Sequence, residues 1–113
     1  MTNSSMPDKW IPVTSVGLNS NGTLFRVRRS FRAAKINPSL GWHIAAIGHG
    51  EETLFQPGDI GICYAARANG TFFLGFGQDR RRPPSASMTK QPTSFAVCIV
   101  CGPAHIDCLE SGA

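Results

Sequence analysis

The chain has 113 residues, with 11 lysines and arginines against 7 acidic residues and a net charge of +4. This length supports one domain with one hydrophobic core and excludes two independent domains. No apolar run approaches the roughly 20 residues of a membrane-spanning helix, and no apolar leader follows the start, so we expect a chain that is neither membrane-bound nor secreted. The four cysteines are too few and too clustered for a disulfide scaffold, so we expect reduced thiols.

The N-terminal part predicts a loose lead-in followed by a first hairpin. Residues 1–9 are polar and show no hydrophobic period. Residues 10–18 are richer in apolar side chains, but Pro12 confines a strand there to an edge or a bulge because proline has no N–H for the ladder. Asn21-Gly22 is a strong hairpin signal, since both central residues of a type I′ turn need positive φ. We therefore expect the strand that begins at Leu24 to pair with the first one.

The segment from residue 24 to residue 35 is the most distinctive of the chain. Phe25 and Val27 alternate with Arg26 and Arg28, which is the period of a strand with one face on a core. The segment holds five of the eleven basic residues. So much like charge is difficult to pack against itself, and residues 28–37 are therefore expected to project from a sheet as a basic arm or hairpin.

The middle of the chain predicts two further strands and the loop between them. The segment of residues 42–47 is short and mostly apolar, as expected for a central strand. Residues 51–59 are predicted as a loop, closed by the turn signal Pro57-Gly58. Residues 60–67 again have the composition of a buried strand.

The C-terminal part begins with a second hairpin signal at Asn69-Gly70, so residues 71–76 should fold back antiparallel to the preceding strand. Residues 77–93 have the composition of a long loop, in which we expect no more than single helical turns. Residues 94–101 are the last predicted strand, and residues 102–113 are predicted as a short tail.

Together these signals predict an all-β fold. No amphipathic helix of ten or more residues is apparent, and a twisted antiparallel sheet with long loops and a protruding basic hairpin fits the pattern best. The predicted organisation is a flexible lead-in at 1–9, a single β domain at 10–101 and a tail at 102–113.

Two separated basic segments, residues 24–35 and Arg80 to Arg82, each have aromatic residues nearby in the sequence. Guanidinium groups can bind phosphates and aromatic rings can stack on bases, so this combination predicts a polyanion-binding surface. The alternative is a solvated face on a basic protein. Arginine runs alone do not separate these two interpretations.

Three motifs and their order carry a resemblance to a known family. They are Arg28-Arg29-Ser30-Phe31-Arg32, a Trp-led segment from Trp42 to Gly50, and Gly61-Ile62-Cys63-Tyr64-Ala65-Ala66. A loop arginine, Arg81, is followed two residues later by Pro83. Over roughly residues 10–97 this order resembles the N-terminal RNA-binding domain of coronavirus and related nidovirus nucleocapsid proteins. The family has tyrosines where this chain has His43, Ala45 and Ala46, which reduces the aromatic surface.

The resemblance implies that the chain binds single-stranded viral genomic RNA for packaging into a ribonucleoprotein. It implies a location in the virion and the host cytoplasm; without a viral origin the expected location is cytoplasmic. No cofactor and no membrane are implied, and weak self-association is a further expectation. The implied RNA-binding residues are Arg26, Arg28, Arg29, Arg32, Lys35, Trp42, His43, Tyr64, Arg80, Arg81 and Arg82.

A zinc site is the first alternative, because Cys98, Cys101, His105 and Cys108 form a compact Cys-Cys-His-Cys set. If the last strand runs through Cys101, however, Cys98 and Cys101 point to opposite faces and cannot share a metal ion. We therefore expect buried thiols and no bound metal.

Catalysis has less support. The three histidines have no evident Ser or Asp partners, and Cys63 lies in an apolar strand, so we do not expect an enzyme. Pro57-Gly58-Asp59-Ile60 also fits small β-barrels of many functions. A protein-interaction barrel without nucleic-acid binding is therefore the main alternative to RNA binding.

Overall fold

The computed structural model describes residues 9–13, 22–39, 48–67 and 70–109. These residues form strands and short 3₁₀ helices with no α-helix among them, so the predicted all-β class is confirmed. None of their helices is long and apolar enough to cross a membrane. The strands are β1 (Trp10–Pro12), β2 (Leu24–Val27), β3 (Phe31–Lys35), β4 (His49–Phe55), β5 (Ile60–Ala66), β6 (Phe72–Phe76), β7 (Val97–Cys101) and β8 (Ile106–Leu109). The 3₁₀ helices are η2 (Ala86–Lys90), η3 (Pro92–Ser94) and η4 (Pro103–His105).

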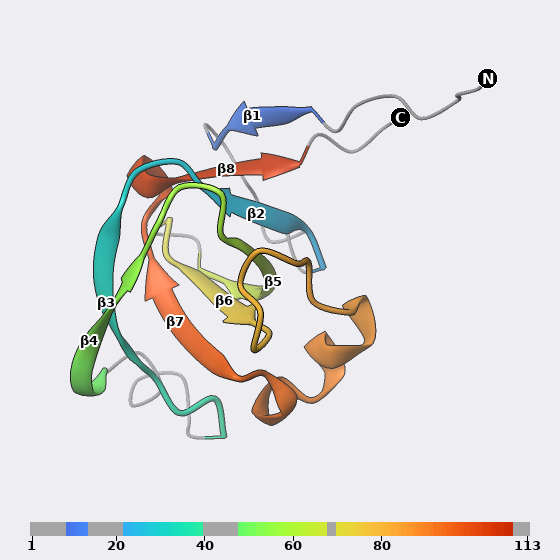
Figure 1. Cartoon of the computed structure of the whole chain (residues 1–113). Coiled ribbons are helices and arrows are strands. Elements are labelled where there is room, and N and C mark those ends of the chain that lie inside the picture. The colour runs from blue at the N-terminus through green and yellow to red at the C-terminus, as the bar shows by residue number, and fades with distance from the viewer. Residues whose placement is uncertain (1–8, 14–21, 40–47, 68–69, 110–113) are drawn as a thin grey trace.

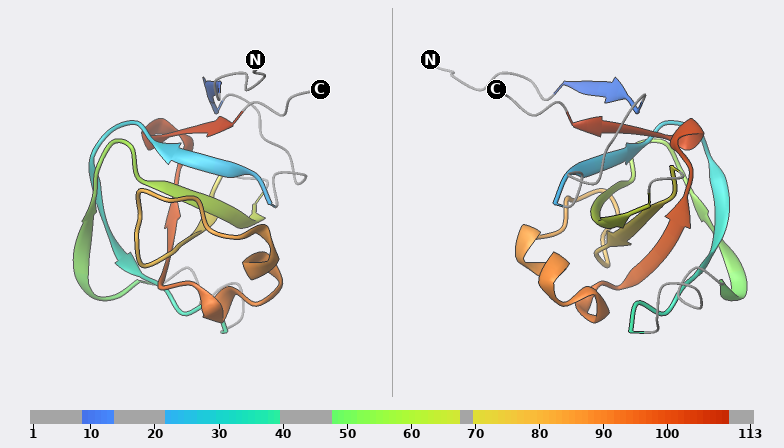
Figure 2. Two further views of the ribbon diagram at one scale, coloured as in Figure 1. Left: turned by 45° about the vertical axis from the view of Figure 1, so that its right-hand side comes forward. Right: turned by 180° about the vertical axis from the view of Figure 1, so that it is seen from behind.

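The strands form one large sheet and one small ribbon (Figure 1). The large sheet has six antiparallel strands in the order β1-β8-β2-β5-β6-β7, and β3 pairs with β4 in a separate two-stranded ribbon. The chain just after β3 returns to the large sheet, because the Ile36 amide donates to the Cys98 carbonyl at 2.8 Å. The ribbon thus curves beside β7 and gives the molecule a barrel-like shape (Figure 2).

The hydrophobic core has two parts, one on each face of the large sheet. The first lies between the sheet and the ribbon and contains Phe25, Val27, Phe55, Cys63, Phe72, Leu74, Phe76, Ile99 and Ile106. The second lies on the outer face, beneath the loop between β6 and β7, and contains Ile36, Ile62, Ala65, Phe73, Phe95 and Cys98. Phe95 lies flat against Gly75, where a Cβ atom would collide with its ring. The long loop is therefore packed onto the sheet.

The two predicted hairpins have different outcomes. β5 and β6 are antiparallel neighbours, and Gly70 between them has φ +89°, so the second hairpin is confirmed. The prediction of the first hairpin is wrong, because β1 pairs with β8, and β8 lies between β1 and β2 in the sheet. Gly22 does have a turn conformation with φ +86°, but its amide donates to the Cys63 carbonyl of β5 at 2.6 Å.

The predicted basic arm is only partly correct. The chain does leave the large sheet after Val27, but residues 31–35 are β3 and pair with β4. Phe31 anchors this strand, since its ring stacks on Phe55 with 5.4 Å between centroids. The basic segment is therefore one strand of a packed ribbon, with Arg32 and Lys35 exposed on it.

Part of the predicted loop at 51–59 is also wrong. Residues 49–55 form β4, which is an edge strand among the described residues and exposes Glu51 and Glu52. Charged residues have low strand propensity but protect an exposed edge against pairing with other chains. The turn at Pro57-Gly58 is present, with φ +96° at Gly58. The predicted strand at 42–47 lies outside the described residues.

The predicted C-terminal tail is corrected as well. Its residues 106–109 form β8, which pairs with both β1 and β2 in the large sheet. Ile106 is fully buried in the first core. The domain therefore continues past Cys101, through η4, into β8. The last predicted strand is present but begins at Val97, since residues 92–94 form η3.

Candidate nucleic-acid interface

Two arginine-containing segments far apart in the sequence meet at the turn between β4 and β5. The Gly58 amide donates to the Val27 carbonyl at 3.0 Å, and the Val27 amide donates to the Asp59 carbonyl at 2.8 Å. On the other side, the Ile60 amide donates to the Arg80 carbonyl at 2.7 Å. The backbone therefore places residues 26–29 and 80–82 on either side of one turn.

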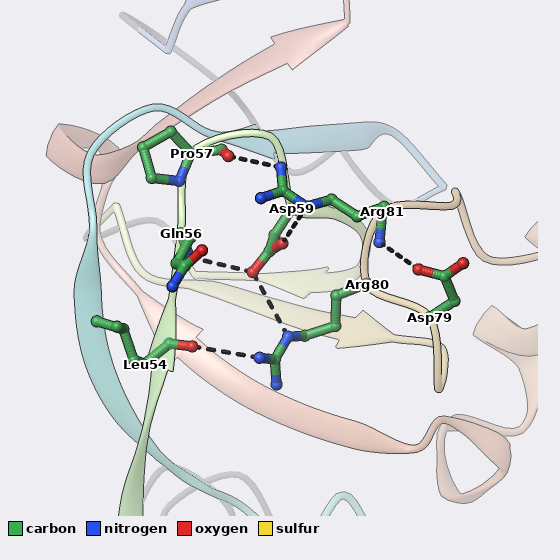
Figure 3. A network of polar contacts seen from close by, with 7 residues as sticks. All are labelled: Leu54, Gln56, Pro57, Asp59, Asp79, Arg80 and Arg81. Carbon is green, nitrogen blue, oxygen red and sulfur yellow. Dashed lines mark hydrogen bonds and ion pairs between the residues drawn. The ribbon is translucent and has the colours of Figure 1, made fainter.

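Asp59 holds two arginines of the second segment (Figure 3). Asp59 is only 4% exposed, and its carboxylate lies 3.4 Å from Arg80 Nε and 3.5 Å from Arg81 Nε. It also accepts a hydrogen bond from the Gln56 amide at 3.0 Å. One buried negative charge thus fixes two positive groups, and we name this arrangement the Asp59 cluster (Arg80, Asp59, Arg81).

Each arginine of the Asp59 cluster has further fixed contacts. Arg80 donates to the Leu54 carbonyl at 3.3 Å and lies over the Phe55 ring at 4.9 Å. Arg81 donates to the Pro57 carbonyl at 2.7 Å. A Cβ atom on Gly58 would collide with Arg81 Nη1, so the glycine both accommodates the positive φ and leaves room for the guanidinium in its present position.

A second aspartate holds two arginines of the first segment. Asp107 on β8 lies 3.8 Å from Arg26 and 3.6 Å from Arg28. Arg28 also donates to the Ala104 carbonyl at 2.9 Å, and the Arg26 guanidinium lies over the Trp10 ring at 4.9 Å. We name this arrangement the Asp107 cluster (Arg26, Asp107, Arg28). The register explains it, because Arg26 is directly opposite Asp107 and both point away from the first core.

The two clusters together leave an excess of positive charge. Arg29 is exposed, and its side chain has no ion pair or hydrogen bond with the described residues. Arg82 is 84% exposed and pairs with Asp79 at 3.3 Å. This region therefore contains six arginines and three aspartates. We name these six residues the arginine face: Arg26, Arg28, Arg29, Arg80, Arg81 and Arg82.

The Asp59 cluster borders a hollow in the surface. It has a volume of about 380 Å³ and is lined by Gln56, Asp59, Gln78, Asp79, Arg80 and Arg81. Its lining includes two carboxylates, which disfavour an anion deep within the hollow. The positive charge is therefore accessible to solvent at the rim of the hollow, where the Arg81 side chain is 57% exposed.

The other predicted RNA-binding residues that the structure describes, Arg32, Lys35 and Tyr64, are not part of the arginine face. Arg32 and Lys35 are exposed on the ribbon, and Lys35 borders a cleft of about 340 Å³ between the end of β3 and the start of β7. Trp42 and His43 lie outside the described residues. Tyr64 packs in the second core, with its ring stacked on Phe95 at 5.8 Å.

Tyr64 is therefore not an open stacking surface. Its hydroxyl is buried beside the Cys98 thiol, and burial raises the pKa of Tyr64 above its ordinary value. Two rings contact the arginine face among the described residues: Phe55, which is fully buried, and Trp10, which is half-buried on β1. No local sequence signal predicts this placement of Trp10, because Trp10 reaches Arg26 only through the pairing of β1 and β2 with β8.

The candidate zinc ligands are not gathered. Cys98 is buried in the second core while Cys101 packs against the first, so the expectation that they point to opposite faces is confirmed. Burial raises the pKa of Cys98 from 9.0 to about 11 and that of Cys101 to about 12. Within the described ranges, no three His, Cys, Asp or Glu side chains are placed to share a metal ion.

Comparison with protein-family models, curated proteins and solved structures finds no significant match to this chain.

Proposed function

We propose that the chain binds single-stranded RNA through the arginine face. The observation that supports this most is the repeated arrangement of two arginines around one buried aspartate. Each cluster carries one more positive charge than negative, and the negative charge lies beneath the guanidinium groups. Phosphates approaching from solvent therefore meet guanidinium N–H donors within a net positive field, which favours their binding.

Trp10 supports single-stranded over duplex RNA as the ligand. An aromatic ring can stack on a base only when that base is unpaired, whereas a duplex presents mainly its phosphates and 2′-hydroxyls. Trp10 is half-buried and adjacent to Arg26, so one base could stack on the ring while the next phosphate contacts the arginine. Packaging of a viral genome, as in the nucleocapsid domains that the sequence resembles, is the biological role we propose for this activity.

A salt series of fluorescence-anisotropy titrations tests the proposal. Affinity for single-stranded RNA should fall steeply with salt and exceed the affinity for duplex RNA of the same length. In the double variant Arg29→Gln/Arg82→Gln, the slope of log affinity against log salt should fall by about 1.4, because each phosphate contact to a single strand contributes about 0.7. Neither side chain is buried, so the fold should be retained.

The matched control is Lys90→Gln, which removes one exposed positive charge from η2. It should leave the salt slope unchanged. Trp10→Ala should weaken binding by about 1–3 kcal/mol without changing the slope, provided that its melting temperature shows a folded protein. Absence of RNA binding at low salt would favour the protein-interaction barrel and end the RNA proposal.

A further inference from the structure

We infer that Ser85 is a phosphorylation site for a serine kinase that selects arginine three residues before its acceptor. We further infer that the phosphate weakens RNA binding at the arginine face; this second part rests on the proposed function. The sequence Arg80-Arg81-Arg82-Pro83-Pro84-Ser85 places arginines three, four and five residues before the hydroxyl. Kinases distinguish their substrates by such charge patterns.

The backbone presents this segment in a suitable form. The two prolines have fixed φ and no N–H, and Ser85 is extended with φ −67° and ψ 137°. The Arg82 amide bonds to the Asp79 carbonyl before them, and the Ser85 carbonyl accepts from Met88 after them. Residues 83–85 belong to no ladder, so an enzyme can bind them as an extended strand at little cost in lost structure.

The acceptor and the selecting arginine are both accessible. Ser85 is exposed, and its hydroxyl contacts only Ser87 of the described residues, at 2.9 Å from the Ser87 hydroxyl. The Arg82 side chain is 84% exposed, and it forms an ion pair with the exposed Asp79. In the reaction, Ser85 Oγ attacks the γ-phosphorus of ATP and forms the O–P bond. The bond from that phosphorus to the β-phosphate bridging oxygen breaks, ADP leaves, and the hydroxyl proton passes to the kinase base.

Ser30 in the first arginine segment provides a contrast within the same chain. It follows Arg28 and Arg29, but the residue three positions before it is Val27. Val27 is 1% exposed, and both its amide and its carbonyl are bonded to the turn at Gly58 and Asp59. A kinase cannot take up this segment without breaking the sheet. Arginine content alone therefore does not define the site, and the structure favours Ser85 over Ser30.

A phosphate at Ser85 lowers the net positive charge of the arginine face. It adds a charge of about −1.5 to −2 at neutral pH, whereas the six arginines exceed their three aspartates by three charges. Arg82 lies three residues away and would pair with the phosphate in preference to Asp79, because a phosphate offers more negative charge and more acceptor oxygens. RNA should lose Arg82 as a contact and also meet a weaker positive field.

The experiment treats the full chain with an arginine-directed serine kinase and Mg-ATP, followed by intact mass measurement and fragmentation. One phosphate on Ser85 is expected, absent from Ser85→Ala and retained in Ser87→Ala. Arg82→Gln should slow the reaction by about tenfold, while Lys90→Gln should not change it. Phosphate on Ser30 or Thr93 in place of Ser85 would overturn the assignment of Ser85. So would a full chain that takes up no phosphate under conditions that phosphorylate a peptide of residues 80–88.

RNA titrations then test the consequence separately. The phosphorylated protein should bind single-stranded RNA about tenfold more weakly at low salt than Ser85→Ala carried through the same kinase treatment. Equal affinities, with Ser85 fully phosphorylated, would overturn the regulatory part and leave RNA binding intact. If neither sample binds RNA, the proposed function fails together with its regulation, whereas the mapped phosphate still decides the site.

Discussion

The Asp59 and Asp107 clusters have the same composition but different surroundings. Asp59 lies at a turn, accepts a backbone hydrogen bond from Gln56, and its arginines also bind the carbonyls of β4 and the turn. Asp107 lies within a strand, its arginines are 3.6 and 3.8 Å away, and its Oδ1 has no hydrogen bond among the described residues. The same pairing of charges thus closes a loop in one place and joins the neighbouring strands β2 and β8 in the other.

This difference separates a structural role from a binding role. Arg80 is fixed by a carboxylate, a carbonyl and a ring, so little of its binding capacity remains for a ligand. Arg28 also has a carbonyl partner, but its ion pair is longer, and among the described residues its side chain, which is 39% exposed, has no ring contact. We therefore expect substitutions in the Asp59 cluster to affect mainly stability, and those in the Asp107 cluster to affect mainly RNA binding.

The largest effect is expected from Asp59→Asn. Removing this carboxylate leaves two guanidinium groups beside a buried amide, and breaking a buried charged network costs about 2–4 kcal/mol of the free energy of unfolding. Urea denaturation measures it. Asp79→Asn is the matched control, since the Asp79 side chain is 59% exposed and should cost less than about 0.5 kcal/mol. Equal effects for the two variants would show that the Asp59 cluster is not structural.

Gly58→Ala should have the next largest effect. The new Cβ strains a backbone at φ +96° and displaces Arg81 from the Pro57 carbonyl, so we expect a loss of about 2 kcal/mol. Gly70→Ala separates the two causes, because Gly70 has φ +89° but no atom within 4 Å of an added Cβ. It should cost about 1 kcal/mol, as expected for strain alone. If both variants lose the same stability, the contact with Arg81 contributes nothing.

Asp107→Asn should reduce stability by only about 1 kcal/mol, because its ion pairs are long and its arginines are partly exposed. RNA affinity should rise about threefold at low salt, since one negative charge is removed from the arginine face. Anisotropy titration beside a urea curve measures both quantities. Weaker RNA binding by a folded Asp107→Asn protein would mean that Asp107 positions the arginines, and that their geometry matters more than their net charge.

The sequence predicted the parts of this fold that depend on residues adjacent in the sequence. Asn69-Gly70 sets its turn by its own conformational preference, and the long loop was evident from its composition. β8 was missed because Ile106-Asp107-Cys108-Leu109 alternates over only four residues, too few to distinguish a strand from a tail. Its place in the sheet depends on partners in β1 and β2, which lie at the opposite end of the chain.

The candidate site shows the same limit. The sequence identified the arginines but not the aspartates that hold them, because Asp59 and Asp107 meet their partners only through tertiary pairing. Tyr64 was assigned to the site from a family resemblance, whereas alternation along β5 places it on the same face as Ile62, against the second core. Residues 10–18 were predicted only as a strand, without a role for Trp10 in the site. Residue types were therefore predictable, and their pairing was not.

The smallest expected effect is local and uses Cys108 as a reporter of the Asp107 cluster. Cys108 neighbours Asp107 on β8 and is partly buried, whereas Cys98 is 3% exposed in the other core. Burial raises the pKa of both thiols, that of Cys98 to about 11, so the reactive thiolates are scarce at pH 8 and alkylation should accelerate as the pH rises.

Cys108 should react first with iodoacetamide. Asp107→Asn should increase its rate a few-fold, because the variant removes a negative charge that raises the pKa of Cys108 and loosens β8 between its neighbours, with no change at Cys98. Peptide mapping after short exposures at pH 8 gives both rates in one sample. Asp79→Asn serves as the control for removal of a surface charge. Faster alkylation of both cysteines in Asp107→Asn would indicate global opening, in which case Asp107 would stabilise the whole sheet as Asp59 does, and the proposed distinction between the two clusters would fail.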